Sequence, residues 1–332
     1  MAGAGPQPAL SIVVPVYNEE GNVGPLHAEL AADATSQGRP YEIVFVNDGS
    51  RDATLERLAA IADPALRIVD LDGNFGEAAA ISAGFAAARG AVVVTLDGDG
   101  QNDPNDIPKL LGALERGYDA VSGRRLERQE AFFSRVLPSR VANRLIAWAT
   151  GVPVYDCGCG LKAYRRELVT GAQLPRGMNR FLPALLGVVP SRVTEITTQD
   201  RPRGSGASHY GFSRTFVVLR DLLSLPLLVR GGPVGRGHVH ALNAAVIFLL
   251  IAAVAVAGRS LAAAMTALLA AGAAAAIRHN VVRVVHARES GVFRVRRILH
   301  HGNDDEDRHR GGGVLGHEPA PDLRARAGGA RH

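Results

Sequence analysis

Short apolar runs rich in β-branched residues alternate with helical segments through the N-terminal third of the chain, and polar residues follow each run. Runs of this length, bounded by turn-forming residues, are typical of buried strands. Strands that alternate with helices predict an α/β fold, in which helices cover both faces of a mostly parallel sheet. The expected strands are 10–16, 41–46, 66–71 and 91–96. The expected helices are 22–36, a second that Ser50 or Asp52 caps and that runs to about 62, and 77–89.

Polar clusters follow three of these strands. In parallel sheets of this kind, ligands bind at the carboxyl ends of the strands. The fold would bring the three clusters toward one another, so a single binding site is the economical interpretation. The clusters are Asn18-Glu19-Glu20, Asn47-Asp48-Gly49-Ser50 and Asp97-Gly98-Asp99-Gly100-Gln101.

Asp97, Asp99 and Gln101 occupy alternate positions directly after an apolar strand. An extended backbone there would point the three side chains to one side. Carboxylate and amide oxygens suit a hard cation such as Mg²⁺ or Mn²⁺, and a cation that bridges a diphosphate neutralises the charge that develops as the diphosphate leaves. The alternative is a polar turn that caps the helix after Pro104.

Asp48 follows a buried strand and precedes Gly49, which permits a tight turn and the close approach of a ligand. Its carboxylate can accept a hydrogen bond from a nucleobase or a ribose hydroxyl, or it can close an Asx turn. The glycine-rich segment 73–76 is not a GxGxxG fingerprint, and GxxxxGK[ST] does not occur. A dinucleotide-dependent dehydrogenase and a P-loop kinase are therefore disfavoured.

The formal net charge of +5 comes almost wholly from arginine, since Lys109 and Lys162 are the only lysines. A basic balance suits nucleic acid, anionic lipid or phosphate-bearing substrates. Nucleic acid is not expected, because the arginines lie beside apolar runs and lack interleaved aromatic residues. Cys157 and Cys159 form neither a disulfide framework nor a CxxC metal pair, and we expect two buried thiols.

Two apolar runs, 239–257 and 261–277, are separated only by Gly258-Arg259-Ser260. A membrane-spanning helix needs about 20 apolar residues, so the runs predict a two-helix membrane hairpin, with a buried hairpin in a soluble domain as the alternative. Arginines precede the first run and follow the second, against one arginine between them. The positive-inside rule then places both flanks in the cytoplasm. The amphipathic, leucine-rich segment 212–230 is typical of a helix in the membrane interface.

Several ordered segments, read together, match a known family: 14–20, 46–52, 96–104, 156–164 and 203–210. They resemble glycosyltransferase family 2, and within it the polyprenyl-phosphate branch that includes dolichol-phosphate mannose synthases and bacterial polyprenyl-phosphate glucosyltransferases. The resemblance spans roughly residues 10–230. It implies a Rossmann-like glycosyltransferase A fold. It also implies an inverting, metal-dependent transfer of a sugar from a UDP- or GDP-sugar to a polyprenyl (undecaprenyl or dolichyl) phosphate at the cytoplasmic face of the inner membrane.

The resemblance assigns roles to individual residues. The residues that would line the nucleotide pocket are Pro15, Tyr17, Glu19, Asp48 and Gly49, among which Asp48 matches the carboxylate that reads the nucleobase. The residues that would hold Mg²⁺ or Mn²⁺ are Asp97, Asp99 and Gln101. Arginine binds phosphate oxygens in pairs through its planar fork. The arginines expected at phosphates are Arg135, Arg180 and either Arg124 or Arg125.

Asp156 matches the acidic position of the family's DxxxGF[KR] segment, in which Leu161 replaces the more usual Phe. In relatives that attack with a hydroxyl, an acid near this place is the general base. A lipid phosphate, with a second pKa of about 6, is already largely anionic at neutral pH. We therefore expect Asp156 to orient the acceptor, with a general base as the second option. A helix cap or a partner for Lys162 is the structural alternative.

Residues 203–210 resemble the family's RxxGxSK(Y/F) loop near the membrane, with His209 where lysine is usual. Lysine is a fixed cation at neutral pH, whereas histidine, with a reference pKa of about 6.5, is only partly charged. Phosphate binding by Ser208 and His209 would then be weaker or pH-dependent, or Arg203 would carry it. The expected catalytic residues are thus Asp97, Asp99, Asp156 and Arg203.

The expected organisation follows from these segments. The start of the chain lacks the features of a signal peptide, and the mixed charges beyond Gly302 predict disorder. The segments are a tail at 1–9, a cytosolic catalytic domain at 10–211, an interfacial helix and linker at 212–238, the hairpin at 239–277, and a basic juxtamembrane segment with a disordered tail at 278–332.

The sequence is also compatible with other functions. One is a glycosyltransferase with a different acceptor, and another is a non-catalytic membrane scaffold that keeps the nucleotide pocket. A processive polysaccharide synthase is disfavoured, because Pro202 stands where that group's QxxRW motif, if it began at Gln199, would have arginine. The expected partners are the nucleotide-sugar, the polyprenyl phosphate and the membrane, and self-association as a homo-oligomer is left open.

Overall fold

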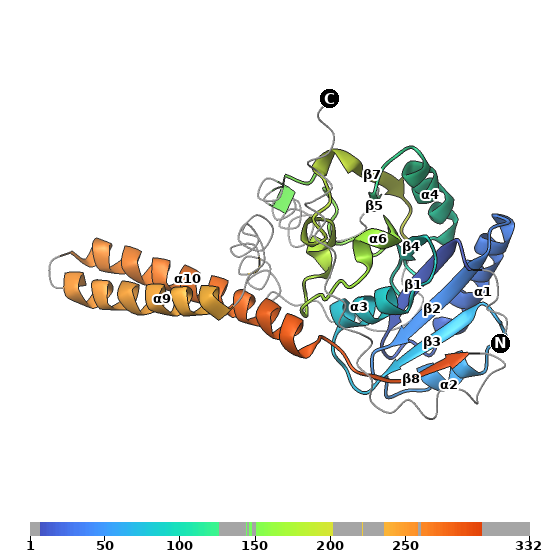
Figure 1. The fold of residues 1–332 in the computed structure, drawn as a ribbon, viewed down its shortest axis with the longest axis horizontal. Helices are drawn as coiled ribbons and strands as arrows, with labels where there is room; N and C mark the ends of the chain where they lie inside the picture. The colour runs from blue at the N-terminus through green and yellow to red at the C-terminus, as the bar shows by residue number, and fades with distance from the viewer. Residues whose placement is uncertain are drawn as a thin grey trace. The chain divides into compact units, whose positions relative to one another are not determined.

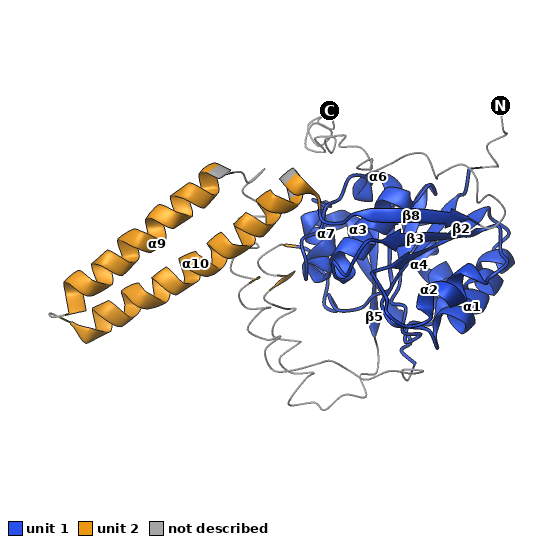
Figure 2. Ribbon diagram, turned by 90° about the horizontal axis from the view of Figure 1, so that it is seen from below, with its two compact units in different colours: residues 1–130, 152–207, 292–332 blue, residues 131–151, 208–291 orange. Residues whose placement is uncertain are grey.

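The computed structural model describes residues 7–125, 144, 146–147, 151–201, 221, 236–257 and 260–300 (Figure 1). The chain divides into two compact units, which have different colours in Figure 2. The first unit comprises residues 1–130, 152–207 and 292–332, and the second comprises residues 131–151 and 208–291.

The first unit is built on one sheet with the strand order β7-β5-β6-β4-β1-β2-β3-β8. β1 pairs in parallel with β2 and β4, and β2 pairs in parallel with β3, since helical segments return the chain between these strands. β6 is antiparallel to β4 and β5, and β7 is parallel to β5. The strands are β1 Leu10–Val16, β2 Tyr41–Asn47, β3 Leu66–Leu71, β4 Val92–Thr95, β5 Ala120–Arg125, β6 Lys162–Arg165, β7 Val193–Thr198 and β8 Val295–His300.

Successive strand residues point to opposite sides of the sheet, so both faces carry buried side chains. Helices cover both of these faces. Ile12 and Phe45 face the core cluster that includes residues of α1, α2 and α4. Val13 and Val46 face α3, which approaches so closely at Gly84 that a Cβ there would lie 2.2 Å from Val13 Cγ1. The helices are α1 Val23–Ser36, α2 Thr54–Ala59, α3 Glu77–Ala87, α4 Ile107–Glu115, α6 Arg166–Val169 and α7 Leu182–Leu185, with 3₁₀ turns η1 Pro104–Asp106, η3 Asn179–Phe181 and η4 Pro190–Arg192.

The structure confirms the α/β prediction for the N-terminal strands. Strands 10–16 and 66–71 have the predicted bounds, and the other two differ only at their ends. The helix expected to run to about 62 ends at Ala59. Of its two expected cap residues, Asp52 accepts hydrogen bonds at Oδ1 from Thr54 N (3.1 Å) and Thr54 Oγ1 (2.5 Å), and the helix begins at Thr54.

β8 lies within the segment 278–332, for which the sequence indicated only a basic juxtamembrane region and a tail. It pairs antiparallel with β3. Arg297 Nε lies 3.3 Å from Asp70 Oδ2, and Arg294 Nε lies 3.1 Å from Asp72 Oδ2. The strand is short and its arginines interrupt the apolar pattern, so periodicity did not reveal it. The tail expected beyond Gly302 lies outside the described residues.

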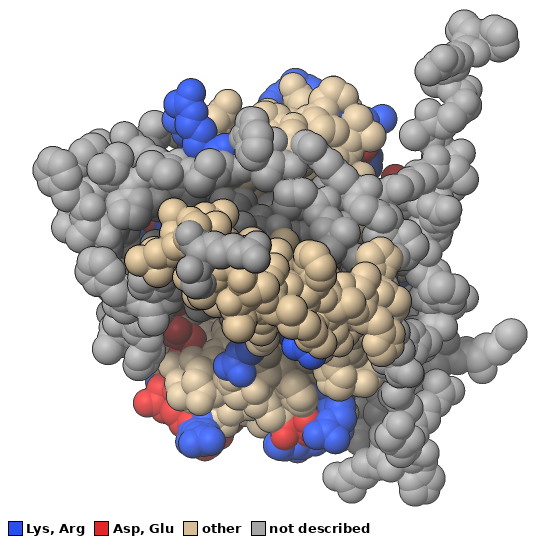
Figure 3. Space-filling view, turned by 90° about the vertical axis from the view of Figure 1, so that its left-hand side faces the viewer, with Lys and Arg blue, Asp and Glu red and all other residues tan. Residues whose placement is uncertain are grey.

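Two long helices, α9 Arg236–Ala257 and α10 Leu261–Ser290, make up most of the described part of the second unit. Gly237–Ala257 and Leu261–Ala287 are long and apolar enough to cross a membrane, with mean hydropathies of 2.5 and 1.7. Large apolar side chains point outward, with Phe248 70% and Leu269 74% exposed, and Figure 3 shows much of the hairpin surface as uncharged. A hairpin in a soluble core would bury such side chains, so the membrane interpretation fits better.

Most of the interfacial segment expected at 212–238 lies outside the described residues, and of it the structure describes only Asp221 and residues 236–238.

Candidate active site

The loops after β1 and β2 form one hydrogen-bonded assembly at the carboxyl edge of the sheet. Asn18 N donates to Ser50 Oγ (2.9 Å), and Arg51 N donates to Asn18 Oδ1 (2.9 Å). Glu19 N donates to Thr54 Oγ1 (2.9 Å). Asn18 has a φ of 56°, in the left-handed region that asparagine tolerates better than most residues. Two of the three polar clusters expected to share a site are therefore in contact.

Asp48 is buried and joins a third loop to this assembly. Its Oδ1 accepts a hydrogen bond from Phe75 N (2.7 Å) and its Oδ2 from Gly76 N (2.8 Å). Burial raises the pKa of the Asp48 carboxyl, and the two N–H donors oppose that shift. Gly49 has a φ of +70°, and a Cβ there would lie 2.6 Å from the Gly73 carbonyl carbon. Asp48 thus orders the loop after β3. This role differs from both roles that the sequence indicated for it, which were a nucleobase contact and an Asx turn.

The other residues predicted for the nucleotide pocket lie on the same edge. Pro15 is in β1, and Tyr17 follows it with 40% of its surface exposed. Glu19 Oε2 accepts a hydrogen bond from Asn22 Nδ2 (2.5 Å), so this carboxylate is held against the start of α1. The structure therefore gathers these candidates beside Asp48, and their contacts with a nucleotide stay a prediction.

The DxD segment turns instead of continuing as an extended strand. Gly100 has a φ of +74°, and Asp99 Oδ1 accepts a hydrogen bond from Gln101 N (3.1 Å). The extended backbone that was expected to aim the three ligand candidates to one side is therefore absent from this segment. The cap of the following turn is Asp103, whose Oδ1 accepts from Asn105 N (3.0 Å), so the DxD acids do not serve as that cap.

The DxD segment and the Asp156 segment meet at Asp97. A Cβ at Gly160 would lie 2.2 Å from Asp97 Oδ1, so only glycine leaves room for the carboxylate. Thr95 Oγ1 donates to Gly160 O (3.0 Å), which fixes the approach. Two motifs more than 50 residues apart in the sequence are thus in direct contact.

The electrostatics around Asp97 fit a divalent cation. Burial and the negative charges of Glu77 and Asp99 raise the pKa of Asp97 to about 8, and the positive charge of Lys162 opposes this shift. A bound cation would relieve this crowding of carboxylates. Among the described residues, no three His, Cys, Asp or Glu side chains are grouped to hold a metal. A cation held by Asp97, Asp99 and the Gln101 amide would therefore take its remaining ligands from phosphate and water oxygens, as is usual for Mg²⁺.

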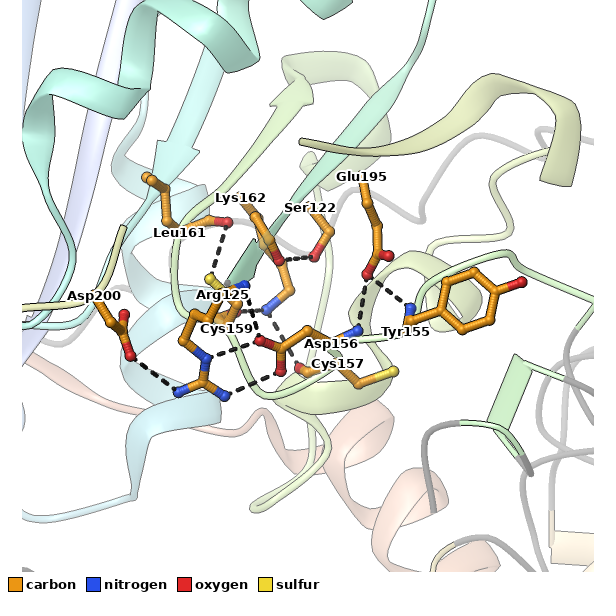
Figure 4. A network of polar contacts seen from close by, with 11 residues as sticks. Ser122, Arg125, Tyr155, Asp156, Cys157, Cys159, Leu161, Lys162, Glu195 and Asp200 are labelled. Carbon is orange, nitrogen blue, oxygen red and sulfur yellow. Dashed lines mark hydrogen bonds and ion pairs between the residues drawn. The ribbon is translucent and has the colours of Figure 1, made fainter. Parts of the chain in front are cut away.

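Asp156 is paired with Arg125, not with Lys162 (Figure 4). Arg125 Nε lies 2.8 Å from Asp156 Oδ2, and its Nη2 lies 3.0 Å from Oδ1. Asp156 N donates to Glu195 Oε1 (2.8 Å). Lys162 is buried and its Nζ donates to the carbonyl of Cys159. The structural alternative considered for Asp156, a partner for Lys162, is therefore replaced by an ion pair with arginine.

The adjacent arginines 124 and 125 have different surroundings. The Arg124 guanidinium is exposed and lies 5.8 Å from the centre of the Tyr155 ring. The Arg125 side chain is 21% exposed, and its Nη1 lies 3.6 Å from Asp200 Oδ2. Of the two, Arg124 is the one accessible to a phosphate. Arg180 is partly buried in η3, and the remaining candidates, Arg135, Arg203, Ser208 and His209, lie outside the described residues.

Sequence reasoning missed four charged residues of this region: Glu77, Arg176, Glu195 and Asp200. Glu77 opens α3 directly after a loop at the carboxyl edge, which is a signal that could have found it. Arg176 Nη2 donates to Asn74 Oδ1 (3.3 Å) beside the Asp48 loop, yet nothing in its local sequence indicates this. Glu195 and Asp200 lie in and after β7, too far along the chain for any local pattern to connect them to Asp156.

The fold and the site define a class. A mostly parallel sheet that carries acidic loops at its carboxyl edge, one of them a DxD turn, is that of a glycosyltransferase of the A fold type. A model of the family described as "Glycosyl transferase family 2" matches residues 11–170. With the relatives below, this match shows that the chain belongs to glycosyltransferase family 2.

Two curated relatives are similar over most of their length. The dodecaprenyl-phosphate galacturonate synthase of Rhizobium johnstonii is 46% identical over 227 residues, which are 67% of each chain. The undecaprenyl-phosphate 4-deoxy-4-formamido-L-arabinose transferase of Pseudomonas aeruginosa is 39% identical over 253 residues, 73% of each chain. The name of each relative includes a polyprenyl phosphate.

Solved structures share the fold at lower identity. Glucosyl-3-phosphoglycerate synthase from Mycobacterium tuberculosis, in complex with Mn²⁺, UDP and glucosyl-3-phosphoglycerate, is 20% identical with a TM-score of 0.52. The match covers 68% of this chain and 81% of that one. Mannosyl-3-phosphoglycerate synthase from Rubrobacter xylanophilus is 18% identical with a TM-score of 0.52, over 68% and 75% of the two chains. These likenesses confirm the predicted fold class.

Proposed function

We propose that this protein transfers a sugar from a UDP- or GDP-sugar to a polyprenyl phosphate, with inversion at the anomeric carbon. The observation that carries the proposal is the contact between Asp97 and Gly160, through which the DxD turn and the Asp156 segment border one site. The names of the two relatives support the acceptor class.

The donor side of this site would bind the nucleotide. The hydrogen-bonded loops after β1, β2 and β3 are already ordered around Asp48, so little ordering entropy would be lost when a nucleotide binds. Asp97, Asp99 and Gln101 would hold Mg²⁺ or Mn²⁺. When bound, such a cation neutralises the charge that develops on the departing diphosphate.

The acceptor side would supply and orient the nucleophile. A phosphate oxygen of the lipid forms a bond to the anomeric carbon, while the bond from that carbon to the diphosphate oxygen breaks and its electron pair leaves with the nucleoside diphosphate. Attack on the face opposite the leaving group inverts the carbon. The lipid phosphate, with a second pKa of about 6, needs no strong base at neutral pH, so Asp156 acts in orientation. The residues that would contact phosphates are Arg124, Arg135, Arg180, Arg203, Ser208 and His209.

The two apolar helices would anchor the enzyme in the inner membrane. Their outward side chains suit lipid, and arginines flank the outer ends of the pair. The positive-inside rule places those flanks, the catalytic domain and the C-terminal tail in the cytoplasm. The lipid phosphate would then meet the site at the cytoplasmic surface.

The experiment that tests this function uses the detergent-purified protein. We expect lipid-linked sugar from one member of a panel of UDP- and GDP-sugars, with Mn²⁺ or Mg²⁺ and a short-chain polyprenyl phosphate. Asp99→Ala and chelation by EDTA should each abolish the product. Glu115→Ala, which removes an exposed carboxylate on α4, should retain the wild-type rate.

Two results would contradict the proposal. Equal transfer to the polyprenol without its phosphate, or to a soluble acceptor, would indicate a different acceptor class. Folded protein that forms no product from any donor would favour a non-catalytic scaffold.

A further inference from the structure

A two-point arginine–aspartate ion pair lies at each end of β5. Before the strand, Arg192 Nε lies 2.6 Å from Asp119 Oδ2, and Arg192 Nη2 lies 2.7 Å from Asp119 Oδ1. At the end of the strand, Arg125 holds Asp156 in the same manner, at 2.8 and 3.0 Å. The second pair is more buried, with side chains 21% and 7% exposed, against 50% and 18% for the first.

The pair at the end of β5 is part of a wider network (Figure 4). Arg125 N also donates to Asp156 Oδ2 (3.3 Å), and Arg125 Nη1 lies 3.6 Å from Asp200 Oδ2. Asp200 forms a β-bridge with Asn102, and the neighbouring Arg201 N donates to Gln101 O (2.8 Å). Arg125 thereby links the Asp156 segment to residues 200–201, which are themselves bonded to the DxD loop.

All three nitrogens of the Arg125 guanidinium face carboxylates. Nε and Nη2 bind Asp156, and Nη1 faces Asp200. Burial alone would lower the pKa of Arg125, but the hydrogen bond and the charge of Asp156 raise it above its ordinary value. An arginine in these surroundings is a permanent cation whose fork is engaged within the protein.

We propose that Arg125 is a positioning residue, which fixes the carboxylate of Asp156 and, through Asp200, holds the acceptor side of the site against the DxD loop. The inference rests on the proposed function, because Asp156 is there assigned to orienting the acceptor. It replaces the phosphate contact that the sequence allowed for either arginine, and it leaves that contact to Arg124.

The kinetic test separates positioning from phosphate binding. Arg125→Gln should lower kcat about 100-fold, since a displacement of about 1 Å at a reacting group costs that factor. The KM for the nucleotide-sugar should stay within about threefold, because a group that acts on orientation changes turnover more than donor binding. Arg125→Lys keeps the charge without the fork and should recover part of the loss. Arg192→Gln breaks the pair at the far end of β5, where Asp119 keeps a contact with Arg165 Nε (3.2 Å), and should leave both parameters unchanged.

A second readout does not depend on activity. Cys157 and Cys159, the only cysteines of the chain, lie within three residues of Asp156 and are both buried. Burial raises the pKa of Cys157 to about 12 and that of Cys159 to about 11, so a thiol reagent such as DTNB should modify the native protein slowly. Loss of the ion pair should open this segment locally and speed modification about tenfold or more. Arg125→Gln should show this increase, and Arg192→Gln should not.

The outcomes decide between the roles. Lower kcat, unchanged donor KM and faster thiol modification support positioning. A raised donor KM with unchanged kcat would make Arg125 a donor-phosphate ligand, and unchanged thiol modification would show that it does not hold the Asp156 segment; either result overturns the inference. If the wild-type protein forms no lipid-linked sugar, the proposed function fails, and thiol modification still decides whether Arg125 holds the segment.

Discussion

The two sides of the candidate site are held together in different ways. On the donor side, backbone N–H groups donate to short side chains of a neighbouring loop, as Asn18 N does to Ser50 Oγ and Phe75 N to Asp48 Oδ1. On the acceptor side, one partly buried guanidinium, that of Arg125, is shared between two carboxylates from different loops.

This difference predicts two kinds of failure. The donor side consists of several bonds worth about 1 kcal/mol each, so the loss of one should weaken nucleotide binding by a modest factor. The acceptor side depends on one buried charge cluster, and the removal of one partner leaves an unpaired charge. Substitutions there should change turnover abruptly while donor binding persists.

The largest effect is expected where the two sides meet. Gly160→Ala would place a Cβ 2.2 Å from Asp97 Oδ1, so either the DxD turn or the Asp156 segment must move. We expect turnover to fall by about 100-fold or more. Gly112→Ala is the control, because a Cβ at this helical position meets nothing closer than 3.7 Å. Steady-state kinetics of both variants, with thermal unfolding to confirm their fold, would check this. A Gly160→Ala enzyme with normal kcat would show that Asp97 is not confined by this contact.

A smaller effect is expected on the donor side alone. Gly49→Ala combines a φ of +70° with a Cβ 2.6 Å from the Gly73 carbonyl carbon, whereas Gly38→Ala has a φ of +63° and open space around it. The left-handed backbone should cost each variant about 1–2 kcal/mol of unfolding free energy, and the close backbone contact should destabilise Gly49→Ala further. Only Gly49→Ala should raise the KM for the nucleotide-sugar, by about tenfold, which corresponds to about 1.4 kcal/mol. Equal donor KM values for the two variants would show that the contact between Gly49 and Gly73 does not affect nucleotide binding.

The same contrast explains what could be predicted from the sequence. The donor side was predictable because each of its loops is a contiguous motif at the end of a parallel strand, and parallel strands bring their carboxyl ends to one edge. Asp48 and Glu19 therefore lie where the pattern indicated. Asp97 and Asp99 also lie on this edge, but the turn between Asp99 and Gln101 depends on the positive φ of Gly100, which the expected extended backbone did not include.

The acceptor side could not be derived in the same way. Arg124 and Arg125 are adjacent residues of the same type, so the sequence does not distinguish them. The alternation of side chains along β5 places Arg125, and not Arg124, against Asp156. Lys162 is close to Asp156 in the sequence, yet its Nζ is engaged by backbone carbonyls. Asp200 joins through a β-bridge that no local pattern encodes. Long-range charge pairing follows from the assembled fold, so sequence motifs identify its members one at a time without their partners.

A single donor-side bond should have a graded effect. Thr54 Oγ1 accepts from Glu19 N (2.9 Å) and donates to Asp52 Oδ1 (2.5 Å). Thr54→Val keeps the shape and removes the hydroxyl, so about 1–2 kcal/mol of stability and a two- to fivefold increase in donor KM are expected. Thr54→Ser keeps the hydroxyl and should bind the donor as the wild type does. A loss of kcat as large as that of Arg125→Gln would contradict the difference between the two sides, because one neutral hydrogen bond would then affect turnover as much as the charged network does.

The smallest effect concerns an ion pair between the donor side and β8, at Asp70, whose Oδ2 also lies 3.7 Å from Arg296 Nη1. Asn47 Nδ2 donates to the buried Asp70 Oδ1 (2.8 Å), and Arg297 Nε lies 3.3 Å from Asp70 Oδ2 with its side chain 52% exposed. Arg297→Gln should cost about 0.5–1 kcal/mol in thermal unfolding, as exposed ion pairs do, and should leave donor KM within about twofold because Asn47 still holds Asp70. Arg294→Gln, on a side chain 78% exposed, is the control and should cost still less. A tenfold rise in donor KM for Arg297→Gln alone would mean that β8 supports the nucleotide loops through charge, and the two sides of the site would then differ in degree and not in kind.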